Sequence, residues 1–309
     1  MKVVAKAGRD DIATVYIAKH QSYGYLEFAQ SLTPPLSRKE KWVILVSSLY
    51  GCPLNCVFCD AGGNFKGLVS KEDIFFQINY ILKEFKSENF CCKKLKIQFA
   101  RMGEPSFNDN VLLALNEMKS KIRGHKIYPS LSTVGPANRE KFFTELLYLK
   151  KKLYKKTFQL QFSIHTTDKT VRDEIIKGKK MDFGEISEYA RDFFDEDGKK
   201  ITLNFIYSEK LPVSIDVIKK YFDREIFLIK VTPVNPTLNA INNNLYSPFS
   251  YDSKSWFNKL RSYGYDVIVS VGEYEENKIG SNCGQYITNY LNSHKNISPS
   301  YTYRIEKVL

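Results

Sequence analysis

Short apolar runs alternate with segments of helical spacing along most of the chain, from Val43 to Ser270. This alternation is typical of a parallel sheet covered by helices, because each parallel strand needs a crossover connection. Six or seven such units fall short of the eight of a closed barrel. The sequence therefore predicts an α/β fold, a partial (β/α)6 barrel. The expected strands are 43–47, 95–100, 126–132, 158–164, 201–206, 226–232 and 266–270.

The regions on either side of the barrel differ in pattern. Residues 1–41 show no long helical pattern, and the runs 13–17 and 23–28 are typical of a β-hairpin. We expect three regions: an N-terminal β-hairpin extension, the barrel, and a C-terminal segment with a loop that carries Cys283. Their expected ranges are 1–41, 42–272 and 273–309. Helices are expected at 138–153 and 183–194, and one whose N-cap is Ser70.

Length and cysteine usage limit the class of protein. The chain has 309 residues and six cysteines, three of them close together. No stretch approaches the roughly 18 to 20 apolar residues of a membrane span, and the first residues lack a secretory pattern. Bunched cysteines fit reduced thiols better than a disulfide framework. We therefore expect a cytoplasmic protein with no membrane contact; the oligomeric state has no signal in the sequence.

The net charge of +12 raises the question of nucleic-acid binding. Several lysines, at 93–94, 150–156 and 199–200, directly precede expected strands. There they would complement helix dipoles on the barrel face opposite the active site, which needs no ligand. Other basic residues follow strands at the expected mouth, where they are candidates for contacting an anionic substrate. These are Arg101, Arg172, Lys177, Lys179 and Lys180.

Three cysteines, Cys52, Cys56 and Cys59, follow the first expected barrel strand within eight residues. Thiolates at this density suit zinc or an iron–sulfur cluster. Structural zinc normally closes a shell of four ligands, and no second cysteine pair or nearby histidine follows. The pattern therefore favours an iron–sulfur cluster with one open position. Zinc, or three unrelated buried cysteines, remain as alternatives at this point.

Polar and glycine-rich groups follow four further strands. Chemistry in such barrels lies at the carboxyl ends of the strands, so these groups should meet at one mouth together with the cysteines. The segments are 101–105 (Arg-Met-Gly-Glu-Pro), 132–135 (Ser-Thr-Val-Gly), 163–165 (Ser-Ile-His) and 233–236 (Pro-Val-Asn-Pro).

The cysteine spacing, Cys-x3-Cys-x2-Cys, resembles that of the radical S-adenosylmethionine superfamily. With the strand-end motifs and a late Cys-Gly-Gln at 283–285, the stretch from about Trp42 to Tyr286 resembles the radical adenine methyltransferases of ribosomal and transfer RNA. The resemblance implies that the cysteines hold three irons of a [4Fe-4S] cluster. The fourth iron would bind S-adenosyl-L-methionine, and an external one-electron reductant such as flavodoxin or ferredoxin would serve the cluster.

The resemblance also implies contacts to S-adenosylmethionine. Its amino group would lie against Gly103 and Glu104, since an ammonium prefers a carboxylate or carbonyl partner. The residues implied for the carboxylate, the ribose and the rest of the pocket wall are Ser132, Ser163, His165 and Asn235.

Cys283 would be the catalytic residue. In the resembling family this cysteine receives a methyl group from one S-adenosylmethionine, and a radical from a second molecule removes a hydrogen from that methyl. The carbon radical then adds to the adenine ring. Glycines at 280 and 284 would let the loop move the thiol to the mouth.

Two departures from the family matter. The family places a second catalytic cysteine seven residues before the first cluster cysteine, and here that position is Leu45, which can neither accept a proton nor form a disulfide. Cys91 and Cys92 should lie at the far end of the barrel. The family's N-terminal RNA-binding domain has no counterpart in the expected hairpin, and residues 271–277 are acidic, which weakens the case for RNA as a partner.

Three functions are therefore open. The first is methylation of an sp2 carbon through methylated Cys283, with an RNA adenosine as the default substrate. The second is different radical chemistry, such as hydrogen abstraction or thioether formation, on a small molecule or peptide. The third is a non-catalytic protein that binds the cluster and S-adenosylmethionine, which the intact cofactor motifs argue against.

Overall fold

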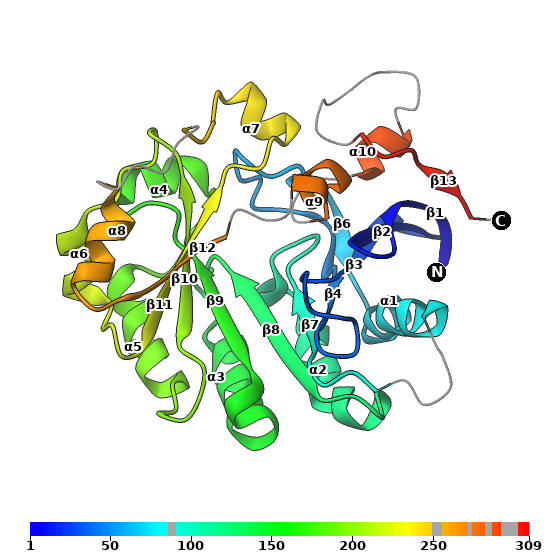
Figure 1. Ribbon diagram of the computed structural model, residues 1–309, viewed down its shortest axis with the longest axis horizontal. Helices are drawn as coiled ribbons and strands as arrows, with labels where there is room; N and C mark the ends of the chain where they lie inside the picture. Colours follow the sequence, from blue (N-terminus) through cyan, green and yellow to red (C-terminus); the bar gives the residue numbers. More distant parts are fainter. Residues whose placement is uncertain (86–90, 249–254, 271–273, 282–285, 292–301, 309) are drawn as a thin grey trace.

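A single curved sheet of eleven strands organises the protein (Figure 1), with the strand order β12-β11-β10-β9-β8-β7-β4-β3-β2-β1-β13. The computed structural model describes residues 1–85, 91–248, 255–270, 274–281, 286–291 and 302–308. A separate two-stranded hairpin, β5 (Leu49–Cys52) with β6 (Gly63–Leu68), flanks the cysteine loop.

Seven consecutive strands of the sheet run parallel and form the partial barrel, which confirms the expected α/β fold. Each lies within one or two residues of its expected position, because the apolar runs mark strands that are buried against helices. They are β4 (Trp42–Val46), β7 (Leu95–Phe99), β8 (Ile127–Thr133), β9 (Gln159–Ser163), β10 (Ile201–Tyr207), β11 (Phe227–Pro233) and β12 (Asp266–Val269).

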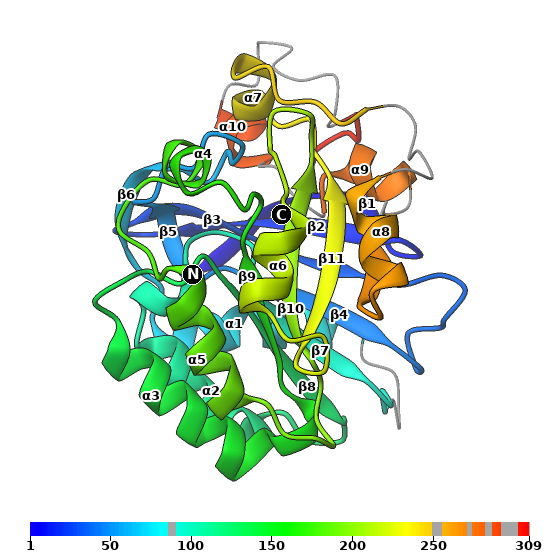
Figure 2. The same ribbon diagram turned by 90° about the vertical axis from the view of Figure 1, so that its left-hand side faces the viewer.

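Helices cover the outer face of these strands (Figures 1 and 2). The first begins where the sequence predicts, since the Ser70 hydroxyl accepts a hydrogen bond from the Asp73 amide. Another begins with a capping box between Asp182 and Glu185. The helices between strands are α1 (Lys71–Glu84), α2 (Asn110–Lys121), α3 (Glu140–Leu149), α4 (Lys169–Ile175), α5 (Phe183–Phe193), α6 (Ile215–Tyr221), α7 (Leu238–Asn242) and α8 (Trp256–Ser262).

The N-terminal strands extend the barrel sheet. The expected hairpin is β2 (Ala13–His20) with β3 (Gly24–Ser31), and β3 pairs antiparallel with β4. The sequence prediction missed β1 (Lys2–Arg9), which pairs with β2 on one side. On its other side lies β13 (Glu306–Lys307), from near the end of the chain.

Two short helices of the C-terminal segment pack beside these strands. They are α9 (Tyr274–Ile279), which contacts β1 and β2, and α10 (Tyr286–Leu291), which contacts β2 and β3 (Figure 1). None of the helices in the described part of the chain has the length and apolar character that crossing a bilayer requires.

The two faces of the barrel strands differ in chemistry. Side chains that point outward, such as Ile97, Phe99 and Phe162, are fully buried against the helices. Their neighbours along the strands point into the barrel and are largely polar, as with Gln98 and Gln161. Since side chains of a strand alternate between faces, the sheet separates an apolar outer core from a polar interior.

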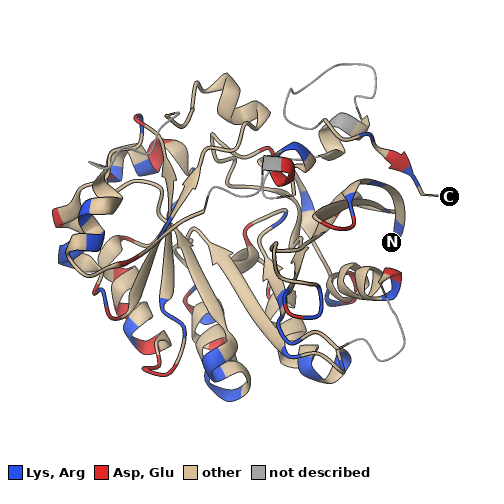
Figure 3. Ribbon diagram, viewed as in Figure 1, with Lys and Arg blue, Asp and Glu red and all other residues tan. Residues whose placement is uncertain are grey.

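The predicted dipole role of the lysines is wrong for two of the pairs. Helix α1 ends at Glu84, well before Lys93 and Lys94, and α5 ends at Phe193, before Lys199 and Lys200. These lysines therefore lie beyond the reach of a helix end. Basic and acidic residues are interspersed along the outer helices (Figure 3).

Candidate active site

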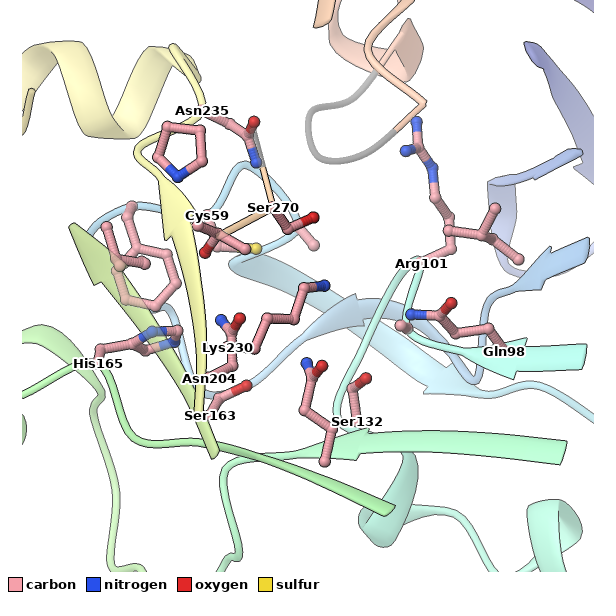
Figure 4. Close-up of a pocket in the computed structure, with 18 of the residues that line it drawn as sticks. Cys59, Gln98, Arg101, Ser132, Ser163, His165, Asn204, Lys230, Asn235 and Ser270 are labelled. Carbon is pink, nitrogen blue, oxygen red and sulfur yellow. The ribbon is translucent and has the colours of Figure 1, made fainter. Parts of the chain in front are cut away.

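The carboxyl ends of the barrel strands surround a cavity of about 770 Å³. This volume falls in the range of about 300 to 1,000 Å³ typical of sites for small ligands. Every sequence-predicted site residue in the described part of the chain lines this one cavity (Figure 4). These are Cys52, Cys56, Cys59, Gly103, Glu104, Ser132, Ser163, His165 and Asn235; Figure 4 labels Cys59, Ser132, Ser163, His165 and Asn235.

The three cysteines come from one loop at the edge of the cavity. Cys52 ends β5, and Cys56 and Cys59 follow in the turn before β6. Burial raises the pKa of the Cys52 thiol and raises that of Cys56 to about 12. Such thiols stay protonated until a metal displaces the proton. The donor set is sulfur alone, which is the ligand set of iron–sulfur clusters.

A single-ion site has no support in the part of the chain that the structure describes. There, no three His, Cys, Asp or Glu side chains are arranged to ligate one metal ion. In a [4Fe-4S] cluster each cysteine binds a different iron, so its ligands surround a larger group. The three thiols, which share one cavity wall, fit that requirement.

Helix α7 fixes the position of the cysteine loop. The Thr237 hydroxyl donates to the Phe58 carbonyl at 2.8 Å, and the Asn239 amide side chain donates to the Cys59 carbonyl at 2.7 Å. In return, the Asp60 carboxylate accepts from the Asn239 backbone amide at 2.9 Å. Hydrogen bonds from the α7 region to Phe58, Cys59 and Asp60 therefore fix the position of the third cysteine.

Gly103 can only be glycine in this structure. Its φ of +90° lies in the region that side chains disfavour, and a Cβ at this position would lie 2.4 Å from the Cβ of Leu49. The backbone thus passes directly over the start of β5. This close approach brings the Gly103 peptide and the following carboxylate to the cavity wall.

The Glu104 carboxylate is completely buried and well satisfied. Its Oε1 accepts hydrogen bonds from the amide and hydroxyl of Ser106 and from the Thr133 hydroxyl, at 3.1, 2.7 and 2.5 Å. Among the described residues, the one hydrogen-bond donor to its Oε2 is the Val134 amide, at 2.9 Å. Burial raises the pKa of Glu104 despite these hydrogen bonds. The second lone pair of Oε2 remains for a cationic ligand group.

His165 has a backbone φ of +66°, which is unusual for a residue other than glycine. Burial, with a further contribution from Arg172, lowers its pKa to about 3, so the imidazole is neutral. Its ring meets the Phe58 ring edge-on, with 4.7 Å between centroids. This contact joins the end of β9 to the cysteine loop.

Ser132 Oγ, His165 Nδ1 and Asn204 Oδ1 are buried polar atoms of the cavity wall that have no hydrogen-bond partner among the described residues. Leaving such atoms unsatisfied costs about 1 to 3 kcal/mol each. A bound ligand rich in hydroxyl, amino and carboxylate groups would satisfy them. S-adenosylmethionine has those groups, so the cavity wall fits it.

Sequence reasoning missed several residues of this wall, namely Gln98, Gln161, Asn204 and Lys230. The signal was present, because each alternates with outward apolar residues in its strand. The rule that active sites lie at strand ends does not identify them, because these four residues lie within the strands.

Three of the basic residues predicted to contact an anionic substrate are used internally. Arg101 pairs with buried Glu27, and the Arg172 guanidinium donates to the Val134 carbonyl. Lys180 pairs with Asp173 at 2.5 Å. Their charges are therefore already neutralised or hydrogen-bonded within the protein.

The remaining predicted residues fall in different places. Leu45 is 8% exposed and lines the cavity, opposite Gln98 on the neighbouring strand. Cys91 is exposed and Cys92 is buried just before β7, and neither lines the cavity. Cys283 lies outside the described residues.

A partial parallel barrel with a three-cysteine loop at its strand ends is the arrangement that the resemblance to radical S-adenosylmethionine enzymes predicts. A radical SAM methyltransferase from Sphaerobacter thermophilus superposes on the protein with a TM-score of 0.66. The match covers 92% of this chain and 80% of the other at 17% identity, so it concerns the fold.

Sequence comparison extends this result. The dual-specificity RNA methyltransferase RlmN of Aliarcobacter butzleri is 28% identical over 258 residues, which span 80% of this chain and 67% of the relative. The probable RlmN of Desulfitobacterium hafniense is 25% identical over 256 residues, 80% and 68% of the two chains. No protein-family model matches the chain. The chain is thus similar to RlmN methyltransferases along about 80% of its length, and its three-cysteine loop and polar cavity wall fit a [4Fe-4S] cluster and S-adenosylmethionine.

Proposed function

We propose that this protein is a radical SAM methyltransferase that methylates an sp2 carbon, with an RNA adenosine as the default substrate and Cys283 as methyl carrier. One observation supports this most. Arg101 lines the cavity and its Nη1 donates to the carbonyls of Gly280 and Ser281, both at 2.9 Å. The residues directly before Cys283 are thereby held at the wall of the cavity that carries the cluster cysteines.

The residues of the cavity have distinct roles in this proposal. Cys52, Cys56 and Cys59 hold the cluster, which together with S-adenosylmethionine supplies a carbon radical after one-electron reduction by flavodoxin or ferredoxin in the cytoplasm. Glu104 Oε2 accepts from the ammonium of the bound cofactor. The groups proposed for its carboxylate, ribose and surroundings are Ser132, Ser163, His165 and Asn235.

Leu45 stands at the position of the second catalytic cysteine of the resembling family, so release of the product from Cys283 would need another group. Among the described residues, the thiols that line the cavity are those of the three cluster cysteines. A covalent link between Cys283 and the product therefore has no second free thiol there to resolve it. This supports the alternative of a different radical reaction, such as hydrogen abstraction or thioether formation, in which Cys283 does not carry a methyl group.

The deciding experiment is mass spectrometry of the peptide that contains Cys283, after anaerobic expression with S-adenosylmethionine. We expect a methyl group on Cys283, together with S-adenosylhomocysteine and 5′-deoxyadenosine in turnover assays. The control is Cys91→Ala, which alters an exposed thiol outside the cavity. An unmodified Cys283 in protein with a full cluster, accompanied by 5′-deoxyadenosine alone, would favour the alternative chemistry.

A further inference from the structure

Lysine side chains gather inside the barrel. Lys230 lies in the middle of β11, and its ammonium extends into the cavity between Asn204 and Gln98 (Figure 4). Lys41, directly before β4, also lines the cavity. Lys96 is on the same face of β7 as Gln98, one pleat closer to the start of the strand.

These lysines lack acidic partners. No carboxylate in the described ranges lies within ion-pair distance of Lys41, Lys96 or Lys230, although twelve other Lys, Arg and His residues have such a partner. Glu276 acts on Lys41 only at longer range. Lys41, Lys96 and Lys230 are half-buried, and partly desolvated ammonium groups without a counter-ion are unfavourable, so an anion from outside the protein would stabilise the cluster.

The lysines also repel one another. Burial and the charges of Lys230, Lys199, Lys41 and Lys94, in that order, lower the pKa of Lys96 to about 7. Burial together with Lys41 lowers the pKa of Lys230. An anion bound among them would remove both the repulsion and the cost of burial.

Aromatic contacts compensate for part of this charge at the amino ends of the strands. The ammonium groups of Lys94, Lys126 and Lys199 lie 5.5, 5.7 and 5.1 Å from the centre of the Tyr128 ring. A cation–π contact is weak compared with the desolvation of an ammonium. The ring also does not reach Lys230 or Lys41, which face the cavity.

We propose that Lys230 and Lys41, which line the cavity, form with the neighbouring Lys96 a phosphate-binding site inside the barrel, which takes a terminal phosphate of the substrate nucleotide. Lysine is a common phosphate ligand because its ammonium acts as a compact point charge. The neutral side chains of Gln98 and Asn204 line the cavity beside it and supply hydrogen-bond donors.

A phosphate monoester fits this location better than a phosphodiester. The chain on both sides of a phosphodiester must continue, whereas the lysines lie within the barrel on and beside β4, β7 and β11. The inference rests on the proposed function and narrows its substrate. The acceptor is a nucleotide with a terminal phosphate, either free or at the 5′ end of an RNA.

The test is isothermal titration of the anaerobic holoenzyme, with cluster and S-adenosylmethionine bound. We expect adenosine monophosphate to bind at least about tenfold more tightly than adenosine. Lys230→Gln should weaken adenosine monophosphate binding about 10- to 100-fold and leave adenosine binding unchanged, because a charge-assisted hydrogen bond is lost. Lys151→Gln removes an equal charge from an exposed position and should change neither.

Loss of Lys230 relieves repulsion, so the variant should fold at least as stably as the parent. Lys41→Gln, at the cavity edge, gives a second and independent variant. Equal binding of adenosine monophosphate and adenosine, or an unchanged affinity in both variants, would overturn the proposal. Phosphate-dependent binding without any methylated product would support the phosphate site and contradict only the methyltransferase function.

A 5′-phosphorylated RNA oligonucleotide and its dephosphorylated counterpart separate the two sources of phosphate. If only the phosphorylated oligonucleotide binds more tightly than adenosine monophosphate, the site binds the 5′-phosphate at the end of an RNA. If adenosine monophosphate binds more tightly than either oligonucleotide, the site serves a free nucleotide. Both results support the site itself.

Discussion

The Arg101 guanidinium and the Glu27 carboxylate form a buried ion pair, with 2.6 Å between Nη2 and Oε1 and side chains 3% and 0% exposed. Each partner also holds the C-terminal segment. Arg101 donates to the carbonyls of Gly280 and Ser281, and Glu27 Oε2 accepts from the Ile287 amide at 3.3 Å. One ion pair thus fixes the chain on both sides of residues 282–285.

Replacing Arg101 by methionine should lower the free energy of unfolding by about 3 to 5 kcal/mol, since it leaves the Glu27 carboxylate buried without its partner. It should also slow methylation of Cys283. Urea denaturation and mass spectrometry measure the two effects. Asp109→Asn is the matched control, because it breaks the more exposed pair with Arg139 and should cost at most about 1 kcal/mol. Equal losses in the two variants would contradict the central role of the buried pair.

Substituting alanine for Cys52, Cys56 or Cys59 should abolish binding of the cluster, since each is proposed to hold a separate iron. Iron and sulfide content per chain after anaerobic reconstitution is the measurement. Cys92→Ala removes a buried thiol outside the cavity and should retain full iron. Full iron in any of the first three variants would remove that cysteine from the ligand set.

Glu104→Gln should weaken S-adenosylmethionine binding about 10- to 100-fold, as expected when a charge-assisted hydrogen bond to an ammonium is lost. The new amide group would also face the donors of Ser106, Thr133 or Val134. Equilibrium dialysis with reconstituted protein measures the affinity. Glu117→Gln, on the outer face of α2 and paired with Lys71, should bind the cofactor normally. An unaltered affinity of the Glu104 variant would show that the carboxylate has only a structural role.

Lys96 predicts a specific dependence of stability on pH. Its pKa is about 7 in the folded protein and 10.5 in the unfolded chain. Between these values the unfolded chain binds a proton that the folded protein lacks, so the free energy of unfolding should rise with pH through this window. The destabilisation caused by burying Lys96 should be largest below pH 7. Each pH unit adds up to about 1.4 kcal/mol.

Comparison with Lys96→Met isolates this contribution. Urea unfolding at pH 7 and pH 9, without phosphate, should show a gain for the parent about 2 kcal/mol larger than that for the variant. The groups acting on Lys96, which are Lys230, Lys199, Lys41 and Lys94, remain in both proteins. Parallel pH profiles would mean that Lys96 is charged in the folded state at neutral pH.

Local patterns made much of the fold predictable from sequence. The barrel strands and the Ser70 cap depend on apolar periodicity and on residues three positions apart, which a sequence displays directly. Pairing of β3 with β4, and of β13 with β1, depends on contacts between distant segments, so it could not be predicted. The lysines at 96 and 230 were hidden within runs interpreted as apolar strands.

The strand order has a topological consequence. Strands β12 and β13 are consecutive in sequence but lie at opposite edges of the eleven-stranded sheet. Four residues separate the end of β12 from helix α9, yet this helix packs on β1 and β2. The two edge regions of the sheet are therefore joined through the residues that precede Cys283.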